Sequence, residues 1–147
     1  MRLPLRVARA VREAFPASKP VFVRITATDW AVGGISVEEA SIFAKEELAA
    51  VGIDLLDVTS GVLVRDARPP ARDGVNVEFA KTLKKASGIA VAPVGEIRDL
   101  TLVGDVVAEG HVDAVLVGRA LLRDPYFALR NRADDRLAWP NQYHRAV

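Results

Sequence analysis

The sequence predicts an α/β fold of about four parallel β-strands with covering helices, and two observations predict this class. Short runs of aliphatic residues with little polar alternation recur along the chain, as in strands that are covered on both faces of a parallel sheet. Helical patterns separate these runs, and successive runs begin roughly 23 to 36 residues apart, which suits right-handed βαβ units.

The predicted elements follow one another without a linker. A helix comes first, and we expect its arginines on a solvated face: Arg2, Arg6, Arg9 and Arg12. The predicted strands cover residues 21–25, 55–58, 90–94 and 114–117.

Helices fill the spaces between these strands. Ser36 and Glu39 match a capping box, in which each side chain bonds the other residue's backbone amide, so a helix begins there. Apolar residues then continue at helical spacing to Gly52, which is placed to end the helix. Further helices are predicted over 79–86, before Gly88, and over 99–109, before Gly110.

The loops are unequal, and this places the functional face. Turns from helix to strand are short, whereas two loops from strand to helix are long and cover 26–35 and 59–76. Long loops without regular structure are uncommon unless they are functional. Chemistry in parallel α/β folds gathers at the carboxyl ends of strands. We expect the following residues there: Arg24, Asp29, Trp30, Ser60, Gly61, Arg68, Gly95, Gly118 and Arg119.

The chain has 147 residues, which is one domain's length but less than the roughly 250 of a complete (β/α)₈ barrel. Four strands make half of such a barrel, and from spacing alone a small four-stranded doubly wound domain is the alternative. We predict one domain over 1–147, in which 138–147 form a C-terminal tail.

Composition excludes several classes of protein. Net charge is +1, from 20 basic and 19 acidic residues that are well mixed, so no basic field marks a nucleic-acid or membrane partner. The chain has no cysteine, which excludes disulfides and thiolate chemistry. No apolar run approaches the roughly 18 residues of a membrane span, and the N-terminus lacks the apolar core of a signal peptide. We expect a cytoplasmic protein.

Two strands end in glycine, at Gly95 and Gly118, and Arg119 follows the second. A glycine lets a phosphate approach the backbone, and a guanidinium group can bind two phosphate oxygens. The pattern predicts a phosphate site after the last two strands. The alternative is a plain strand-end turn followed by a surface charge.

Arg24 interrupts the aliphatic run of the first strand. A buried arginine without a partner is costly, so this side chain must find a carboxylate or a ligand. The sequence leaves both open: an ion pair with Asp57 or Asp29, or a ligand contact.

Five stretches of the chain, in order, resemble one known family. They are 23–30 (VRITATDW), 52–61 (GIDLLDVTSG), 94–95 (VG), 118–126 (GRALLRDPY) and 139–145 (WPNQYHR). They resemble the C-terminal half of the Old Yellow Enzyme family, in the NADPH dehydrogenase class called thermophilic-like or YqjM-like.

The resemblance implies a (β/α)₈ barrel that binds FMN, accepts hydride from NAD(P)H and passes it to an activated alkene. By resemblance, Arg24 would lie against the flavin's pyrimidine edge, and Gly118 and Arg119 would hold the cofactor phosphate beside a backbone contact from Gly95. Arg145 would reach into the active site of a neighbouring subunit, which implies a homo-oligomer.

The chain also departs from this family. Members run to more than twice its length, and the absent half would supply the histidine pair that binds the substrate carbonyl and the tyrosine that donates a proton. Met1 falls where relatives are in mid-helix, which suggests a truncated or split reading frame. His111 falls on a helix-to-strand turn and His144 in the tail. A carboxylate at Glu96 would repel an anionic phosphate.

We therefore expect the FMN-binding half of an NAD(P)H-dependent oxidoreductase, incomplete as a catalyst by itself and completed by an N-terminal half or by self-association. The alternative function is a non-catalytic, self-associating half-barrel that binds a phosphate ligand or nothing. A small phosphosugar-binding α/β domain is the third hypothesis.

Overall fold

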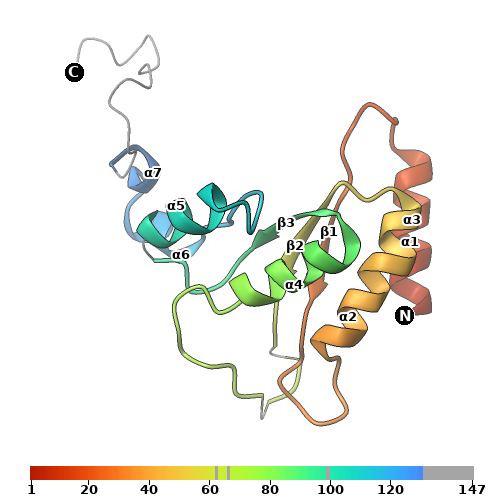
Figure 1. The fold of residues 1–147 in the computed structure, drawn as a ribbon, viewed down its shortest axis with the longest axis horizontal. Helices are drawn as coiled ribbons and strands as arrows, with labels where there is room; N and C mark the ends of the chain where they lie inside the picture. Colours follow the sequence, from red (N-terminus) through yellow and green to blue (C-terminus); the bar gives the residue numbers. More distant parts are fainter. Residues whose placement is uncertain (62, 66, 99, 131–147) are drawn as a thin grey trace.

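The computed structural model describes residues 1–61, 63–65, 67–98 and 100–130 (Figure 1). Its centre is a parallel sheet in the order β1-β2-β3, formed by β1 (Phe22–Thr26), β2 (Leu55–Thr59) and β3 (Ala90–Pro93). The register places Arg24 beside Asp57, and Asp57 beside Ala92. The first three predicted strands are confirmed to within one residue at each end.

The fourth predicted strand is not formed as a strand in the described residues. Val94 and Leu116 form one isolated parallel bridge, and Leu116 N donates to the Pro93 carbonyl at 3.0 Å. The segment does run beside β3, but the Asp113 carboxylate accepts from the Val91 amide at 2.9 Å. The Asp113 carboxylate thus takes the Val91 N–H group, which in a regular ladder would donate to a backbone carbonyl.

The helices enclose the sheet from one face and both sides (Figure 1). The described helices are α1 (Arg2–Ala14), α2 (Val37–Phe43), the π-turn η1 (Ala44–Leu48), α3 (Ala49–Val51), α4 (Val77–Ser87), α5 (Leu100–Ala108), α6 (Arg119–Arg123) and α7 (Phe127–Arg130). Elements α1 to α3 lie on one side of the sheet and α5 to α7 on the other, with α4 between them. Among the helices of the described residues, none combines the length and the apolar character that a membrane span requires.

The helix boundaries follow the predicted capping signals. The Ser36 hydroxyl accepts from the Glu39 amide at 3.3 Å, and the Ser36 amide donates to Glu39 Oε2 at 3.0 Å, which completes the capping box. Gly52 and Gly88 end their helices in the left-handed region, with φ of 81° and 71°. The helix that begins after Ser36 runs on to Val51 through the π-turn, which periodicity alone did not predict.

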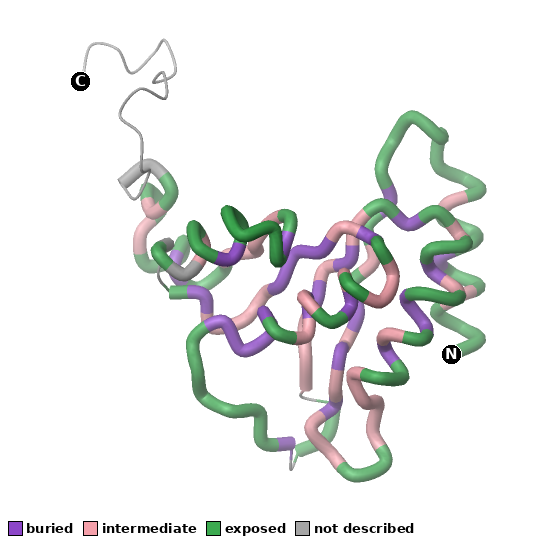
Figure 2. The backbone as a smooth tube through the Cα atoms, viewed as in Figure 1, coloured by how far each residue is buried: buried purple, intermediate pink, exposed green. Residues whose placement is uncertain are grey.

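The core lies between the sheet and helices α2, η1 and α4. Inward-facing Leu56, Val58 and Val91 are fully buried, as are Leu48 and Leu83 on the helices (Figure 2). The strand residues among them alternate with residues of the opposite face, because successive side chains of a strand point to opposite sides.

The prediction that all strands are covered on both faces is wrong for β1. Phe22 is 61% exposed, and the side chain of Arg24 is 64% exposed on the same face. Within the described residues, this face of the sheet is uncovered at β1, whereas Ala92 of β3 on the same face is buried. The sheet therefore presents an open face beside its outer strand.

Side-chain hydrogen bonds to Asp54 connect the amino ends of β1 and β2 with helix α1. Asp54 Oδ2 accepts from the Val21 amide at 2.7 Å and from Arg12 Nη1 at 3.3 Å. Arg12 was expected on a solvated face, but its side chain is only 17% exposed. It also donates to three carbonyls in the turn after α1, those of Phe15, Pro16 and Lys19.

Candidate functional site

A cleft of about 540 Å³ lies at the carboxyl end of β3. It is lined by Val94, Gly95, Glu96, Ile97, Arg98, Leu116, Gly118, Arg119, Ala120, Leu122 and Arg123. Three residues predicted for a phosphate site, Gly95, Gly118 and Arg119, thus come together from two different loops. The bridge between Val94 and Leu116 brings these loops side by side.

Glu96 occupies the centre of the charged groups in this cleft. Its Oε1 accepts from Arg119 Nη2, and its Oε2 accepts from Arg98 Nη2 and, at 3.0 Å, from Arg98 Nε. The hydrogen bonds from Arg119 and then Arg98 hold the pKa of the Glu96 carboxyl below its ordinary value. The hydrogen bond to Glu96 in turn raises the pKa of Arg98. Glu96 is therefore ionised and bridges two arginines.

The backbone at this turn is unusual at two consecutive residues. Gly95 has φ of 131° and Glu96 has φ of 50°. A Cβ on Gly95 would lie 2.8 Å from Asn76 Nδ2 and 3.1 Å from Val75 Cγ1, closer than such atoms normally approach. Asn76 is buried and donates from Nδ2 to the Val94 carbonyl. The glycine at 95 is thus required by packing within the protein, a reason that the sequence did not reveal.

Gly118 and Arg119 begin the short helix α6. A Cβ on Gly118 would meet no atom within 4 Å, so the backbone there is open on its outer side. The Gly118 carbonyl accepts from the amides of Leu121 and Leu122 at 3.0 and 3.2 Å. The Arg119 side chain is 72% exposed and extends to Glu96. Its guanidinium group is within reach of a ligand in the cleft but already has a carboxylate partner.

Arg24 pairs with Asp57, one of the two carboxylates that the sequence offered. Arg24 Nε and Nη2 each lie 2.7 Å from Asp57 Oδ2, while Asp57 Oδ1 is buried with no hydrogen-bond partner in the described structure. Because side chains alternate along strands, Arg24, Asp57 and Ala92 share the open face of the sheet. Val94, the next residue on that face after Ala92, lines the cleft. Arg24 thus lies on the sheet face that leads to the cleft.

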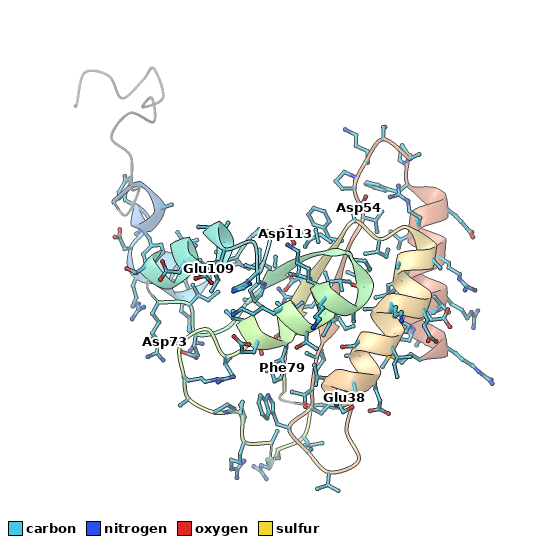
Figure 3. All side chains as sticks on the ribbon, viewed as in Figure 1. Glu38, Asp54, Asp73, Phe79, Glu109 and Asp113 are labelled. Atoms are coloured by element: carbon cyan, nitrogen blue, oxygen red, sulfur yellow. The ribbon has the colours of Figure 1, made fainter. Side chains whose placement is uncertain are left out.

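The loops after β1 and β2 are joined through Trp30. Its Nε1 donates to Ser60 Oγ at 3.0 Å, and its ring lies 5.5 Å from that of Phe79 at an angle of 57°. A Cβ on Gly61 would lie 2.9 Å from Trp30 Cδ1. Trp30 therefore packs between the loop after β2 and helix α4, which carries Phe79 (labelled in Figure 3).

Arg98 is the functional candidate that the sequence analysis missed. The available signal was an arginine two residues after Glu96, in a loop where a carboxylate would need a cation. Arg98 Nε also lies 3.6 Å from Asp73 Oδ1 in the long loop before α4. Arg145 and His144 lie outside the described residues.

The charges of the cleft suit an anion, although a carboxylate already occupies it. Three arginines, Arg98, Arg119 and Arg123, line the cleft together with one carboxylate, that of Glu96. A phosphate would therefore meet net positive charge and the open backbone of Gly118. It would also meet Glu96, which holds the cation that the phosphate needs.

Comparison with solved structures gives the class of protein. The described fold is similar to that of a 2-naphthoyl-CoA reductase solved with 2-naphthoyl-CoA, with a TM-score of 0.75 and 27% identity over 88% of this chain and 20% of that chain. It is also similar to histamine dehydrogenase from Rhizobium sp. 4-9, with a TM-score of 0.71 and 23% identity over 88% of this chain and 19% of that chain. The chain thus has the fold of one part of larger redox enzymes.

The model of the NADH:flavin oxidoreductase / NADH oxidase family matches residues 1–137, and the chain belongs to this family. This confirms the resemblance to the Old Yellow Enzymes. An NADPH dehydrogenase of Listeria monocytogenes serotype 4a (strain HCC23) is 37% identical over 142 residues, which are 95% of this chain and 41% of that protein. The NADPH dehydrogenase of Bacillus subtilis (strain 168) is 34% identical over 128 residues, 86% of this chain and 37% of that protein. The chain therefore spans less than half the length of these relatives.

Proposed function

We propose that this chain is the FMN-binding, C-terminal half of a (β/α)₈-barrel flavin oxidoreductase of the ene-reductase type that uses NAD(P)H. The observation that carries the proposal is the cluster of three arginines around the cleft after β3, in a chain of the NADH:flavin oxidoreductase family. Flavin and NADPH are also what the family description and the names of the relatives point to.

In this proposal the cleft holds the phosphate of FMN. Arg119 would donate two hydrogen bonds to phosphate oxygens, and the backbone at Gly118 and Gly95 would lie beside them. Arg24 would lie at the pyrimidine edge of the flavin, where its positive charge would stabilise the negative charge of the reduced ring. Bound FMN would supply hydride transfer from NAD(P)H to an activated alkene such as an enone.

The described residues do not complete an ene-reductase site. A substrate carbonyl needs hydrogen-bond donors, and the reduced alkene needs a proton donor. The described histidine, His111, lies in the turn after α5, just before the segment that runs beside β3. Its Nε2 lies 2.9 Å from Glu109 Oε2. We therefore propose that the chain alone reduces enones negligibly.

The open face of the sheet supports a further part of the proposal, an incomplete assembly. β1 is the outer strand of the described sheet and carries the exposed Phe22. An N-terminal half or a second copy of the chain would cover this surface. In a homo-oligomer, Arg145 would reach the cofactor site of the neighbouring subunit. A cytoplasmic location is part of the same proposal.

Equilibrium titration with FMN, followed by flavin fluorescence and absorbance, tests the proposal. Saturable binding by the 147-residue chain is the expected result, together with no NADPH-dependent reduction of cyclohexenone. A chain that leaves the flavin spectrum and fluorescence unchanged at millimolar protein contradicts FMN binding. Measurable turnover by the chain alone contradicts the proposed incompleteness.

One observation favours the alternative, a non-catalytic self-associating half-barrel. Both arginines assigned to the flavin already have carboxylate partners, Asp57 for Arg24 and Glu96 for Arg119. The two functions differ in their ligand, since the alternative half-barrel binds a phosphate ligand or nothing and does not bind the flavin. The FMN titration separates them.

A further inference from the structure

Glu96 links Arg98 and Arg119 by hydrogen bonds, so this cleft already contains an anion. Each oxygen of the Glu96 carboxylate is engaged by a different guanidinium group. Arg119 is largely exposed, whereas Glu96 is only 21% exposed in its side chain. The Glu96 carboxylate therefore lies inside the cleft, and the more exposed Arg119 side chain forms an ion pair with it.

The protein fixes Glu96 in this place through its backbone. The Gly74 amide donates to the Glu96 carbonyl at 3.1 Å, and Gly95 is packed against Asn76. Glu96 itself adopts a left-handed backbone conformation, which is unfavourable for most residues other than glycine and asparagine. A glutamate kept in such a conformation, between two cations, is held there by its surroundings rather than free to leave the cleft.

From these contacts we infer that Glu96 competes with any phosphate for Arg119, and that residue 96 sets the affinity of this cleft for a phosphate group. The inference rests on the proposed function only for the identity of the natural ligand, FMN. It concerns the anion site itself, so inorganic phosphate is a sufficient probe.

The geometry also defines how the exchange occurs. Arg98 binds Glu96 Oε2 through two nitrogens, so Arg98 can keep the carboxylate when Arg119 turns toward a phosphate. The exchange replaces one hydrogen bond from Arg119 to Glu96 with bonds from Arg119 to the ligand. Repulsion between Glu96 and the phosphate remains, reduced by Arg98, and weakens binding.

Glu96→Gln tests this inference because it keeps the shape of the side chain and removes its charge. Phosphate affinity is measured by calorimetry and by the amide signals of residues 118–120 in ¹⁵N NMR spectra. We expect Glu96→Gln to bind inorganic phosphate about fivefold more tightly than the unmodified chain, the size of one exposed ion pair. Adding Arg119→Ala to the variant abolishes the gain.

Glu47→Gln is the matched control. Glu47 also pairs with an arginine, since Arg9 Nη2 lies 3.5 Å from its Oε2, but this pair lies on η1 and α1, away from the cleft. The control changes net charge equally, and we expect it to leave phosphate affinity unchanged. An equal gain in Glu47→Gln assigns the effect to net charge and overturns the inference.

Other outcomes are equally decisive. If folded Glu96→Gln binds phosphate no more tightly than the unmodified chain, Glu96 does not compete and the inference is wrong. If Glu96→Gln fails to fold, Glu96→Asn replaces it, because asparagine tolerates the left-handed conformation. Failure of both to fold gives Glu96 a structural role and overturns the inference. A gain in phosphate affinity without FMN binding supports this inference and contradicts the proposed function.

Discussion

Gly95 is a residue whose identity is fixed by contacts within the fold. Its φ of 131°, and the 2.8 Å that would separate an added Cβ from Asn76 Nδ2, leave no room for a side chain. We expect Gly95→Ala to lower the free energy of unfolding by about 1–3 kcal/mol. Gly104→Ala is the opposite case, because Gly104 lies in helix α5 and a Cβ there meets no atom within 4 Å.

Gly104→Ala should raise the free energy of unfolding by about 0.5–1 kcal/mol, since glycine is unfavourable inside a helix. Urea denaturation followed by circular dichroism measures both variants. Equal effects of the two substitutions would contradict the steric account of Gly95.

Asp113 links stability to pH. Partial burial acts to raise its pKa, but the hydrogen bonds from Lys84 and the Val91 amide, with the charge of Lys84, lower it below the ordinary value. A carboxyl whose pKa is lower in the folded state stabilises the fold above its unfolded pKa of about 3.9, and this contribution is lost as the pH falls through the folded pKa. Figure 3 shows Asp113 and Asp54 at the same end of the sheet, each beside the start of a strand.

We expect Asp113→Asn to lower the free energy of unfolding by about 0.5–1 kcal/mol at pH 7, a modest value because the ion pair with Lys84 is partly exposed. The difference from the unmodified chain should begin to shrink below about pH 4 and should vanish once the pH lies below the lowered folded pKa of Asp113. Asp105→Asn, at an exposed position of α5, is the control for the loss of a carboxylate at another site. A loss of stability in Asp113→Asn that stays constant down to about pH 3, below the ordinary pKa of an aspartate, would refute the linkage.

Partners of charged residues were only partly predictable from the sequence. The sequence left Arg24 an ion pair with Asp57 or Asp29, or a ligand contact, and the strand register, which places Arg24 beside Asp57, accounts for the pair that is formed. Arg12 was expected in solvent because its spacing matches that of its neighbours on the helix. Its bonds to Asp54 and to the turn after α1 depend on the tertiary position of that turn.

At the scale of elements, local signals predicted where helices begin and end. The capping box at Ser36 and the glycines after the helices act over a few residues, so the sequence contains their full cause. The π-turn and the reduced fourth strand depend on packing against other elements. No local pattern encodes the bond from Val91 to Asp113 that interrupts the ladder.

Ser36→Ala tests the contribution of the capping box. We expect it to lower the free energy of unfolding by about 1 kcal/mol, because the Glu39 amide loses its acceptor at the first turn of α2. Ser41→Ala, in the same helix, removes a hydroxyl that donates to the Val37 carbonyl at 2.7 Å. This second change should cost nothing, since such back-bonding does not stabilise helices. Thermal unfolding compares the two, and equal melting temperatures would rule out the cap as a stabilising element.

At the scale of the whole molecule, the main feature is the open face beside β1. Phe22, exposed on that face, would be buried by an N-terminal half or by a second copy. We expect light scattering to find self-association at micromolar concentration, and Phe22→Ser to weaken it about tenfold or more, as the loss of a buried aromatic contact does.

Val32→Ser removes an exposed apolar side chain from the loop after β1 and is the matched control. It should leave the association constant unchanged. A monodisperse monomer at all concentrations would contradict the account of the open face.

The sequence identified the class of fold and the family, because motifs in several loops occur in the right order along the chain. It also placed Gly95, Gly118 and Arg119 at one end of the sheet, since parallel strands bring their carboxyl ends together. It did not predict that Arg98 and Arg119 share Glu96. That contact joins two loops whose conformations follow from Asn76, Gly95 and the bridge between Val94 and Leu116.

The most direct test of the central claim is a double-mutant cycle between the phosphate of the ligand and Arg119. FMN and riboflavin differ by that phosphate, so four dissociation constants, with the unmodified chain and with Arg119→Ala, isolate its interaction with the guanidinium group. We predict that the unmodified chain binds FMN about tenfold more tightly than riboflavin, and that Arg119→Ala removes this preference while riboflavin affinity is unchanged. Equal affinities of the unmodified chain for FMN and riboflavin, or a preference that survives Arg119→Ala, would contradict the claim.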